Sequence, residues 1–326
     1  MTEQPPPPPP GAPGGGGPSP EGGATGPTGP TTCYRHTDRE TGIRCQRCGR
    51  PICPECMNEA AVGFQCPECV RSGRKETRSG RTTYGGARSA DASRTSYVII
   101  GVNVAVWLAV LLTGYTSSHL IDVLGLRGDG LCEVGGRYFS VGQQLCDTRN
   151  GVWLPGVSDG ALWQLVTSAF LHVQIWHLVG NMLGFYIIGP FVEQAVGRAR
   201  FLAICAVSGL AGSTAVLLLT NPYQLTLGAS GIVFGLFGAV AVLLWRSGGD
   251  LRGILTLLAI NVFITFAVPN VSWQGHLGGF AGGLLAAAAI VLAPRGERRA
   301  LVQWSLLAGL LVVVLVVAGL RVVALA

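Results

Sequence analysis

Charged residues are scarce in this 326-residue chain. Asp, Glu, Lys and Arg make up 12% of the sequence, about half their share in a typical soluble domain, whereas hydrophobic residues make up 49%. Between positions 163 and 293 there are only six: Glu193, Arg198, Arg200, Arg246, Asp250 and Arg252. A soluble fold of that size could not cover its surface with so few charges. The composition therefore excludes a simple soluble enzyme and indicates a multi-span membrane protein.

The N-terminus lacks the apolar stretch of a secretory signal. Residues 1–32 contain 11 Pro and 9 Gly, a composition that cannot bury a core, so we expect a disordered tail there. Residues 71–96 are polar and rich in Arg, which predicts a basic linker. The net charge of +6 comes from basic residues beside hydrophobic runs, so we expect no nucleic-acid partner.

Seven apolar runs are long enough to cross a hydrocarbon core about 30 Å thick. They lie at about 97–115, 170–190, 200–220, 227–245, 252–268, 273–293 and 301–323, and the fifth is the shortest. The linker before the first run and the 2–3, 4–5 and 6–7 connections are basic, whereas the 3–4 and 5–6 connections carry no charge. The positive-inside rule then predicts a multi-pass cell-membrane protein with a cytoplasmic N-terminus and an outer C-terminus. This unbroken alternation favours seven spans over six.

Cysteine pairs dominate residues 33–70. Four knuckles with two-residue gaps offer eight ligands, which is the capacity for two tetrahedral Zn²⁺ ions: Cys33 and His36, Cys45 and Cys48, Cys53 and Cys56, Cys66 and Cys69. The close spacing favours interleaved pairing, the first knuckle with the third and the second with the fourth, and leaves a sequential arrangement open. The segment has few large apolar residues, so it would need metal to fold.

Two other interpretations of these cysteines are weaker. A disulfide scaffold conflicts with the predicted cytoplasmic side, where thiols stay reduced, and redox chemistry does not explain four consecutive knuckles. The arrangement resembles B-box-type zinc fingers, which implies a module that binds a cytoplasmic protein. In the predicted outer loop, 116–169, Cys132 and Cys146 are open to either a disulfide or two free thiols.

Polar side chains recur at one depth in the even-numbered spans. His177, Ser230 and His276 fall within the first turns of spans that run in the same direction, so helical rise places them at similar depth. A membrane Ser usually joins two helices by a hydrogen bond and a membrane His usually lines a polar cavity. Their shared depth instead favours a nucleophile with a neighbouring base. Asn181 shares a helical face with His177, and both could donate to an oxyanion.

Glycines repeat every four residues on two of these spans. They are Gly231 and Gly235 on the fourth, and Gly275, Gly279 and Gly283 on the sixth. Small residues let membrane helices pack closely, which predicts that Ser230 comes within hydrogen-bond reach of His276.

Together these motifs resemble the rhomboid family of intramembrane serine proteases. The resemblance rests on His172, His177-x3-Asn181, Gly228-Ala229-Ser230-Gly231 and His276-x2-Gly279 on alternate spans. It implies an all-α polytopic bundle with a six-span core at 97–293 and a seventh span within 294–326. By the resemblance, Ser230 is the nucleophile and His276 the general base, and His177, Asn181 and the Ser230 N–H form the oxyanion hole. Gly228 belongs to the nucleophile motif, and His172 has a supporting role near the mouth of the site.

The resemblance also implies a reaction without a cofactor. The expected substrates are single-span or polytopic membrane proteins cut near their outer ends within the lipid bilayer, with the fifth span as a lateral gate. One departure from the family pattern is Gln164, which follows Trp163 where an Arg is typical, and we expect it to loosen the outer loop. The alternative function is a non-catalytic membrane chaperone or adaptor that recruits partners through the zinc module. A proton-coupled transporter lacks support because no acidic residue lies in mid-span.

Overall fold

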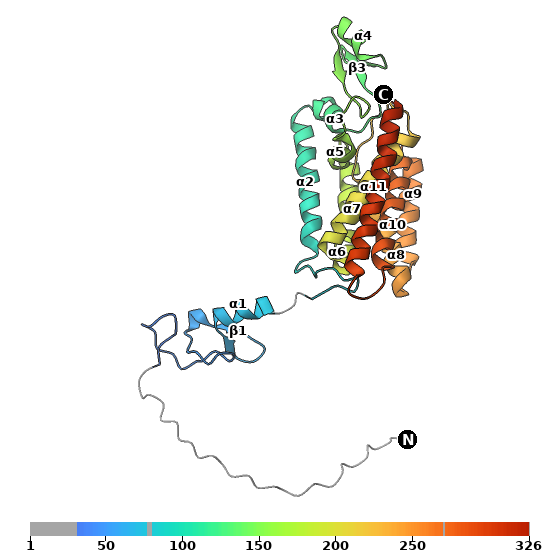
Figure 1. Cartoon of the computed structure of the whole chain (residues 1–326). Coiled ribbons are helices and arrows are strands. Elements are labelled where there is room, and N and C mark those ends of the chain that lie inside the picture. Colours follow the sequence, from blue (N-terminus) through green and yellow to red (C-terminus); the bar gives the residue numbers. More distant parts are fainter. Residues whose placement is uncertain (1–30, 77–79, 270, 326) are drawn as a thin grey trace, which may run out of the picture. The chain divides into compact units, whose positions relative to one another are not determined.

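The computed structural model describes residues 31–76, 80–269 and 271–325. The chain divides between Arg78 and Ser79 into two compact units, a small N-terminal unit and a larger membrane unit. The all-α membrane bundle with a small N-terminal module, predicted from the sequence, is confirmed (Figure 1). Most of the predicted disordered tail, residues 1–30, lies outside the described residues.

The N-terminal unit has short elements and almost no apolar core. It contains a 3-10 helix η1 (Pro54–Cys56), strands β1 (Asn58–Glu59) and β2 (Phe64–Gln65), and helix α1 (Pro67–Glu76). The two strands pair antiparallel, with Asn58 opposite Gln65. Apart from Ile52, every residue of its buried cluster is a cysteine. Such a core cannot hold a fold by apolar burial alone.

The membrane unit contains six helices that are long and apolar enough to span a bilayer. They are α2 (Ser93–Leu112), α6 (Ile175–Val196), α7 (Arg198–Leu219), α8 (Ser230–Ser247), α10 (Trp273–Val291) and α11 (Arg299–Leu325). The fifth apolar run forms α9 (Arg252–Ala267), which has 16 residues. Its length is about 24 Å at 1.5 Å per residue, so it is shorter than a bilayer core.

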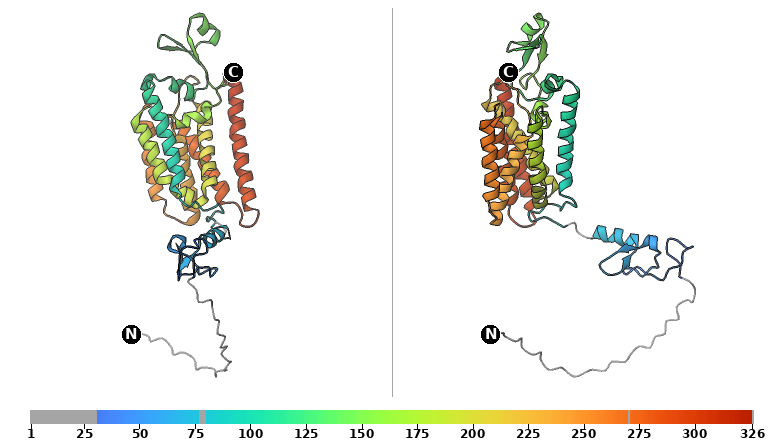
Figure 2. Two further views of the ribbon diagram at one scale, coloured as in Figure 1. Left: turned by 90° about the vertical axis from the view of Figure 1, so that its left-hand side faces the viewer. Right: turned by 180° about the vertical axis from the view of Figure 1, so that it is seen from behind.

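Helix α8 lies at the centre of the bundle, and α7 and α10 pack along it. In contrast, α11 is largely exposed and runs along the outside, as the left view of Figure 2 shows. It is attached by a buried polar contact, because Arg200 donates two hydrogen bonds to Gln303 Oε1 at 2.8 and 2.6 Å. The Gln303 amide also donates to the carbonyl of Ile290 on α10 at 2.7 Å.

The long connection between α2 and α6 folds into a small layer at one end of the bundle (Figure 1). Its helices are η2 (Tyr115–Ser117), α3 (His119–Leu124), α4 (Gln143–Thr148), α5 (Gln164–Thr167) and η3 (Ser168–Phe170). Strands β3 (Leu131–Val134), β4 (Arg137–Phe139) and β5 (Val152–Leu154) form an antiparallel sheet in the order β4-β3-β5. A disulfide joins Cys132 to Cys146, so these two cysteines are not free thiols.

Candidate active site and metal sites

The first turns of α6, α8 and α10 come together at one end of the bundle. His177 is the third residue of α6, Ser230 begins α8, and His276 is the fourth residue of α10. A Cβ at Gly228, two residues before α8, would overlap the ring of His177, and the carbonyl of Gly275 lies 3.3 Å from a Cβ built at Gly231. The residues beside Ser230 therefore touch both α6 and α10.

Glycines allow this close approach. A Cβ at Gly279 would overlap the backbone of Gly231, and a Cβ at Gly283 would overlap the backbone of Gly235. The close packing of α8 against α10 that the glycine spacing predicts is thus confirmed. Ser230 is half-buried, and among the described residues no hydrogen bond joins its hydroxyl to His276. Catalytic hydrogen bonds are often long before substrate binds.

The His276 ring is fixed by two neighbours that the sequence reasoning missed. Phe234, one turn after Ser230, stacks on the ring with centroids 4.0 Å apart and an interplanar angle of 12°. Thr265 Oγ1 on α9 lies 2.8 Å from His276 Nδ1. The position of Phe234 four residues after Ser230 is a usable sequence signal, because it puts the aromatic ring one turn below the serine.

A cavity of about 380 Å³ opens beside this histidine between α8, α9 and α10. Its wall is almost entirely apolar, and His276 and Thr265 are both part of it. His276 is 8% exposed, so it is nearly enclosed and lines this cavity. A hydrophobic peptide segment could approach the ring from this side.

His172 and Asn181 form a buried pair next to His177. The Asn181 amide donates to His172 Nε2 at 2.9 Å, and the Ala229 N–H donates to the same nitrogen at 3.4 Å. The rings of His172 and His177 meet edge to face, with centroids 5.0 Å apart. The structure thus brings four of the predicted residues together: His172, His177, Asn181 and Gly228. Asn181 holds His172 with one of its two N–H groups, which leaves the other for an oxyanion.

Gly228 has a backbone conformation that favours glycine. Its φ angle is +119°, and it directly precedes the start of α8. The first N–H groups of a helix have no partner within that helix and carry a partial positive charge. The Ser230 N–H is one of them, so the turn at Gly228 places an oxyanion donor at the nucleophile candidate.

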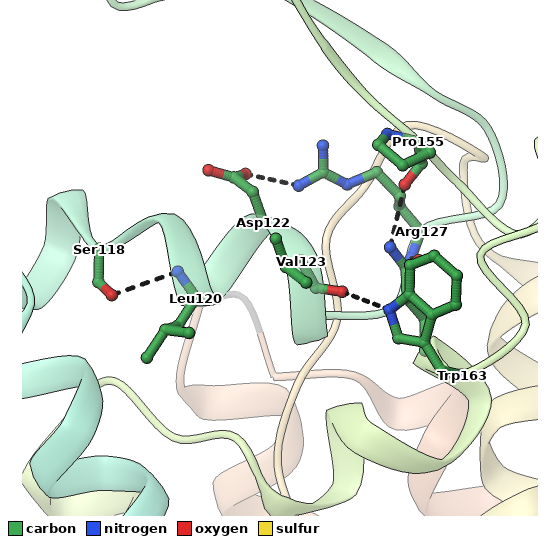
Figure 3. A network of polar contacts seen from close by, with 8 residues as sticks. Ser118, Leu120, Asp122, Val123, Arg127, Pro155 and Trp163 are labelled. Atoms are coloured by element: carbon green, nitrogen blue, oxygen red, sulfur yellow. Dashed lines mark hydrogen bonds and ion pairs between the residues drawn. The ribbon is translucent and has the colours of Figure 1, made fainter.

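The layer formed by the connection between α2 and α6 holds this turn in place. The Gly228 N–H donates to the carbonyl of Ser168 at 2.8 Å, and Leu126 and Thr226 exchange backbone hydrogen bonds at 2.9 and 2.8 Å. Figure 3 shows the polar network that fixes the layer itself, in which Trp163 donates to the Val123 carbonyl at 2.9 Å.

Gln164 is tied into the loop between α2 and α6 by both ends of its side-chain amide. Its side chain is fully buried; its Oε1 accepts from the Arg127 N–H at 3.2 Å, and its Nε2 donates to the carbonyl of Pro155 at 3.0 Å. Arg127 is itself buried and forms an ion pair with Asp122 at 2.6 Å (Figure 3). The neutral amide thus bridges two segments of the loop, where buried polar groups must find partners.

The N-terminal unit gathers its thiols into two groups. The first is Cys33, His36, Cys53 and Cys56, and the second is Cys45, Cys48, Cys66 and Cys69, with the ligand atoms of each group within 4.8 Å of one another. This is the interleaved grouping that the spacing favours. In the first group, His36 Nδ1 lies 3.2 Å from Cys53 Sγ. In the second, Cys48 and Cys66 Sγ are 3.8 Å apart.

The electrostatics of both groups fit a bound cation. Although burial opposes ionisation, backbone hydrogen bonds from Arg35, Cys53 and His36 lower the pKa of Cys33 to about 6. Within the second group, a hydrogen bond to Cys48 and burial raise the pKa of Cys69 to about 12. Crowded thiols cannot all carry charge by themselves, so each group could hold a metal ion that compensates the thiolates.

Known proteins are similar in sequence to part of the membrane unit. The Rhomboid domain family model matches residues 159–293. "Rhomboid protease GluP" of Bacillus subtilis (strain 168) is 39% identical over 145 residues, which are 43% of this chain and 28% of that protein. "Putative rhomboid protease YdcA" of the same organism is 36% identical over 146 residues, which are 43% of this chain and 72% of that protein. "RHOMBOID-like protein 5" of Arabidopsis thaliana is 31% identical over 147 residues, 43% of this chain and 47% of that protein.

The fold and the site define a polytopic helical membrane protein with a serine at a helix N-terminus, packed beside a histidine-bearing helix. The chain belongs to the rhomboid family. Two of these relatives are named as rhomboid proteases. The chain spans less than two thirds of the length of two of these three relatives. The matched residues exclude α2, α11 and the N-terminal unit.

Proposed function

We propose that the chain is an intramembrane serine endopeptidase that cuts transmembrane segments near their outer ends with a Ser230–His276 dyad. The observation that carries this proposal is the contact of the N-terminal turns of α8 and α10. There, Gly231 packs against Gly275 and the residue one turn after Ser230 stacks on His276. A serine hydroxyl needs a neighbouring base to become a nucleophile, and we assign that role to His276 on the packed helix α10.

The chemistry then follows from the side chains. The Ser230 hydroxyl attacks the scissile carbonyl carbon while His276 accepts its proton. The tetrahedral oxyanion accepts hydrogen bonds from the Ser230 N–H and from His177 or the free Asn181 N–H. His276 returns the proton to the leaving amine, and water releases the acyl group by the reverse path. The expected substrates are single-span or polytopic membrane proteins.

We also propose that each thiol group of the N-terminal unit binds one Zn²⁺ ion. Sets of three Cys with one His and of four Cys are typical of structural zinc sites. The ions would be structural and take no part in peptide-bond cleavage. With the N-terminus in the cytoplasm and the C-terminus outside the cell membrane, as the basic connections predict, the zinc unit faces cytoplasmic protein partners.

The test of the dyad compares two serines of one helix. Purified chain in detergent micelles is assayed with a model single-span substrate. We expect Ser230→Ala to lower cleavage on the order of 10⁴-fold or more, because no other group can form the acyl intermediate. Ser247→Ala, at the opposite end of α8, should cleave like the wild type. Undiminished cleavage by Ser230→Ala would reject the dyad, and a cellular phenotype carried by the zinc unit alone would favour the adaptor function.

A further inference from the structure

Thr265 differs from the other polar residues of α9. Only Ile254 and Thr265 are buried on this helix, and Thr265 is 6% exposed. Thr256 is exposed and Asn261 is half-buried, and their side chains bond only to backbone carbonyls of their own helix, at 2.9 Å each. Thr265 is therefore the polar side chain by which α9, among its described residues, reaches into the bundle.

The hydrogen bonds of Thr265 determine which nitrogen of His276 carries a proton. A hydroxyl has a single proton to donate. The Thr265 hydroxyl lies 2.7 Å from the carbonyl oxygen of Asn261, which can only accept. With its proton on that carbonyl, we assign the hydroxyl oxygen as the acceptor across the 2.8 Å contact with His276 Nδ1. Nδ1 then carries the hydrogen, and in a neutral imidazole Nε2 is left with its lone pair.

The ring is constrained in two independent ways. Stacking on Phe234 sets the plane of the imidazole, with 12° between the ring planes. The contact with Thr265 sets the rotation of the ring within that plane. Among the described residues no hydrogen bond reaches Nε2. The nitrogen that must remove a proton from a serine is therefore the one that is basic and free.

We propose that Thr265 is a positioning residue that holds His276 in the Nδ1–H tautomer, with Nε2 available to Ser230. This inference rests on the proposed Ser230–His276 dyad and adds a third member to it. A neutral hydroxyl supplies the orienting acceptor that a carboxylate supplies in serine protease triads. No acidic side chain is needed at this depth, where an ionised group would be costly.

The kinetic test replaces the hydroxyl without changing the shape of the side chain. In the full chain, Thr265→Val should lower kcat about 10-fold and leave KM within about twofold, because one neutral hydrogen bond to the base is lost. Thr265→Ser should restore kcat to within about twofold of the wild type, since it keeps the acceptor. The matched control is Thr256→Val on the same helix, which removes an exposed hydroxyl bonded only to Arg252 and should leave kcat unchanged.

A spectroscopic readout separates positioning from simple packing. In chain labelled with ¹⁵N-histidine, the His276 signals are assigned by their loss in a His276→Asn variant. We expect a protonated Nδ1 and an unprotonated Nε2 in the wild type and a mixture of tautomers in Thr265→Val.

A wild-type Nε2–H tautomer, or identical tautomers and kcat in both proteins, would overturn the inference. If Ser230→Ala cleaves like the wild type, the dyad itself fails. Normal cleavage by Thr265→Val with an inactive Ser230→Ala rejects only the role of Thr265.

Discussion

The buried cluster of the N-terminal unit is Ile52 and cysteines, whereas the main cluster of the membrane unit is built from aliphatic and aromatic side chains of several helices. In the membrane unit, glycine backbones on α8 and α10 touch directly, and buried hydrogen bonds fix the layer between α2 and α6. The N-terminal unit gathers ligand atoms that could hold a cation, whereas the helices of the membrane unit pack directly against each other. The two units should therefore lose their structure under different treatments.

Metal removal should have the largest effect, and only on the N-terminal unit. Chelation of the full chain should abolish the protease resistance of residues 31–76, because zinc binding in such modules contributes most of the folding free energy. Substrate cleavage should stay within about twofold of the untreated protein, since no predicted ligand lies in the membrane unit. Limited proteolysis and metal analysis measure both effects, with about two Zn²⁺ per chain expected before treatment.

Two single cysteine substitutions, one inside a thiol group and one outside both groups, provide a test and a control for this experiment. Cys53→Ser should reduce the bound metal to about one ion per chain, because it removes a ligand of one group only. Cys205→Ser changes a buried cysteine of α7 that belongs to neither group and should leave the metal content unchanged. If residues 31–76 stay resistant to proteolysis in a chain shown to be free of metal, the N-terminal unit does not depend on metal for its fold.

A glycine substitution should disturb the membrane unit by a smaller amount. Gly279→Ala places a methyl group against the backbone of Gly231, which cannot move without separating α8 from α10. We expect a loss of about 1–3 kcal/mol in the free energy of unfolding, together with reduced cleavage. Thermal unfolding in detergent measures the first effect. Gly309→Ala on α11 is the control, because a Cβ there would meet no atom within 4 Å. Equal melting temperatures for the two variants would show that the helix contact is not close.

Much of the fold could be predicted from the sequence because hydrophobic length and ligand spacing are local signals. The apolar runs locate the ends of the spans to within six residues, and α9 is the short one as expected. The interleaved thiol groups follow from the close spacing of the knuckles. The small sheet β4-β3-β5 was not predicted, since its short strands lie among turn residues in a loop whose pairing is set by tertiary contacts.

The supporting residues of the site were harder to predict. Thr265 resembles any helical threonine, because its bond to Asn261 is the ordinary one and its contact with His276 depends on how α9 packs. Arg127 and Gln164 belong to the loop between α2 and α6, where polar residues are normally solvated, yet both are buried. Motif spacing identifies candidate chemistry, whereas the groups that orient it come from non-local packing.

Reaction of the full chain with a serine-directed fluorophosphonate, followed by mass spectrometric mapping, tests the central claim most directly. An activated serine reacts with such a probe only when a base removes its proton. We predict one modified residue, Ser230, and loss of that modification in His276→Ala. Labelling of Ser230 that persists without His276, or modification of a different serine, would contradict the proposed dyad.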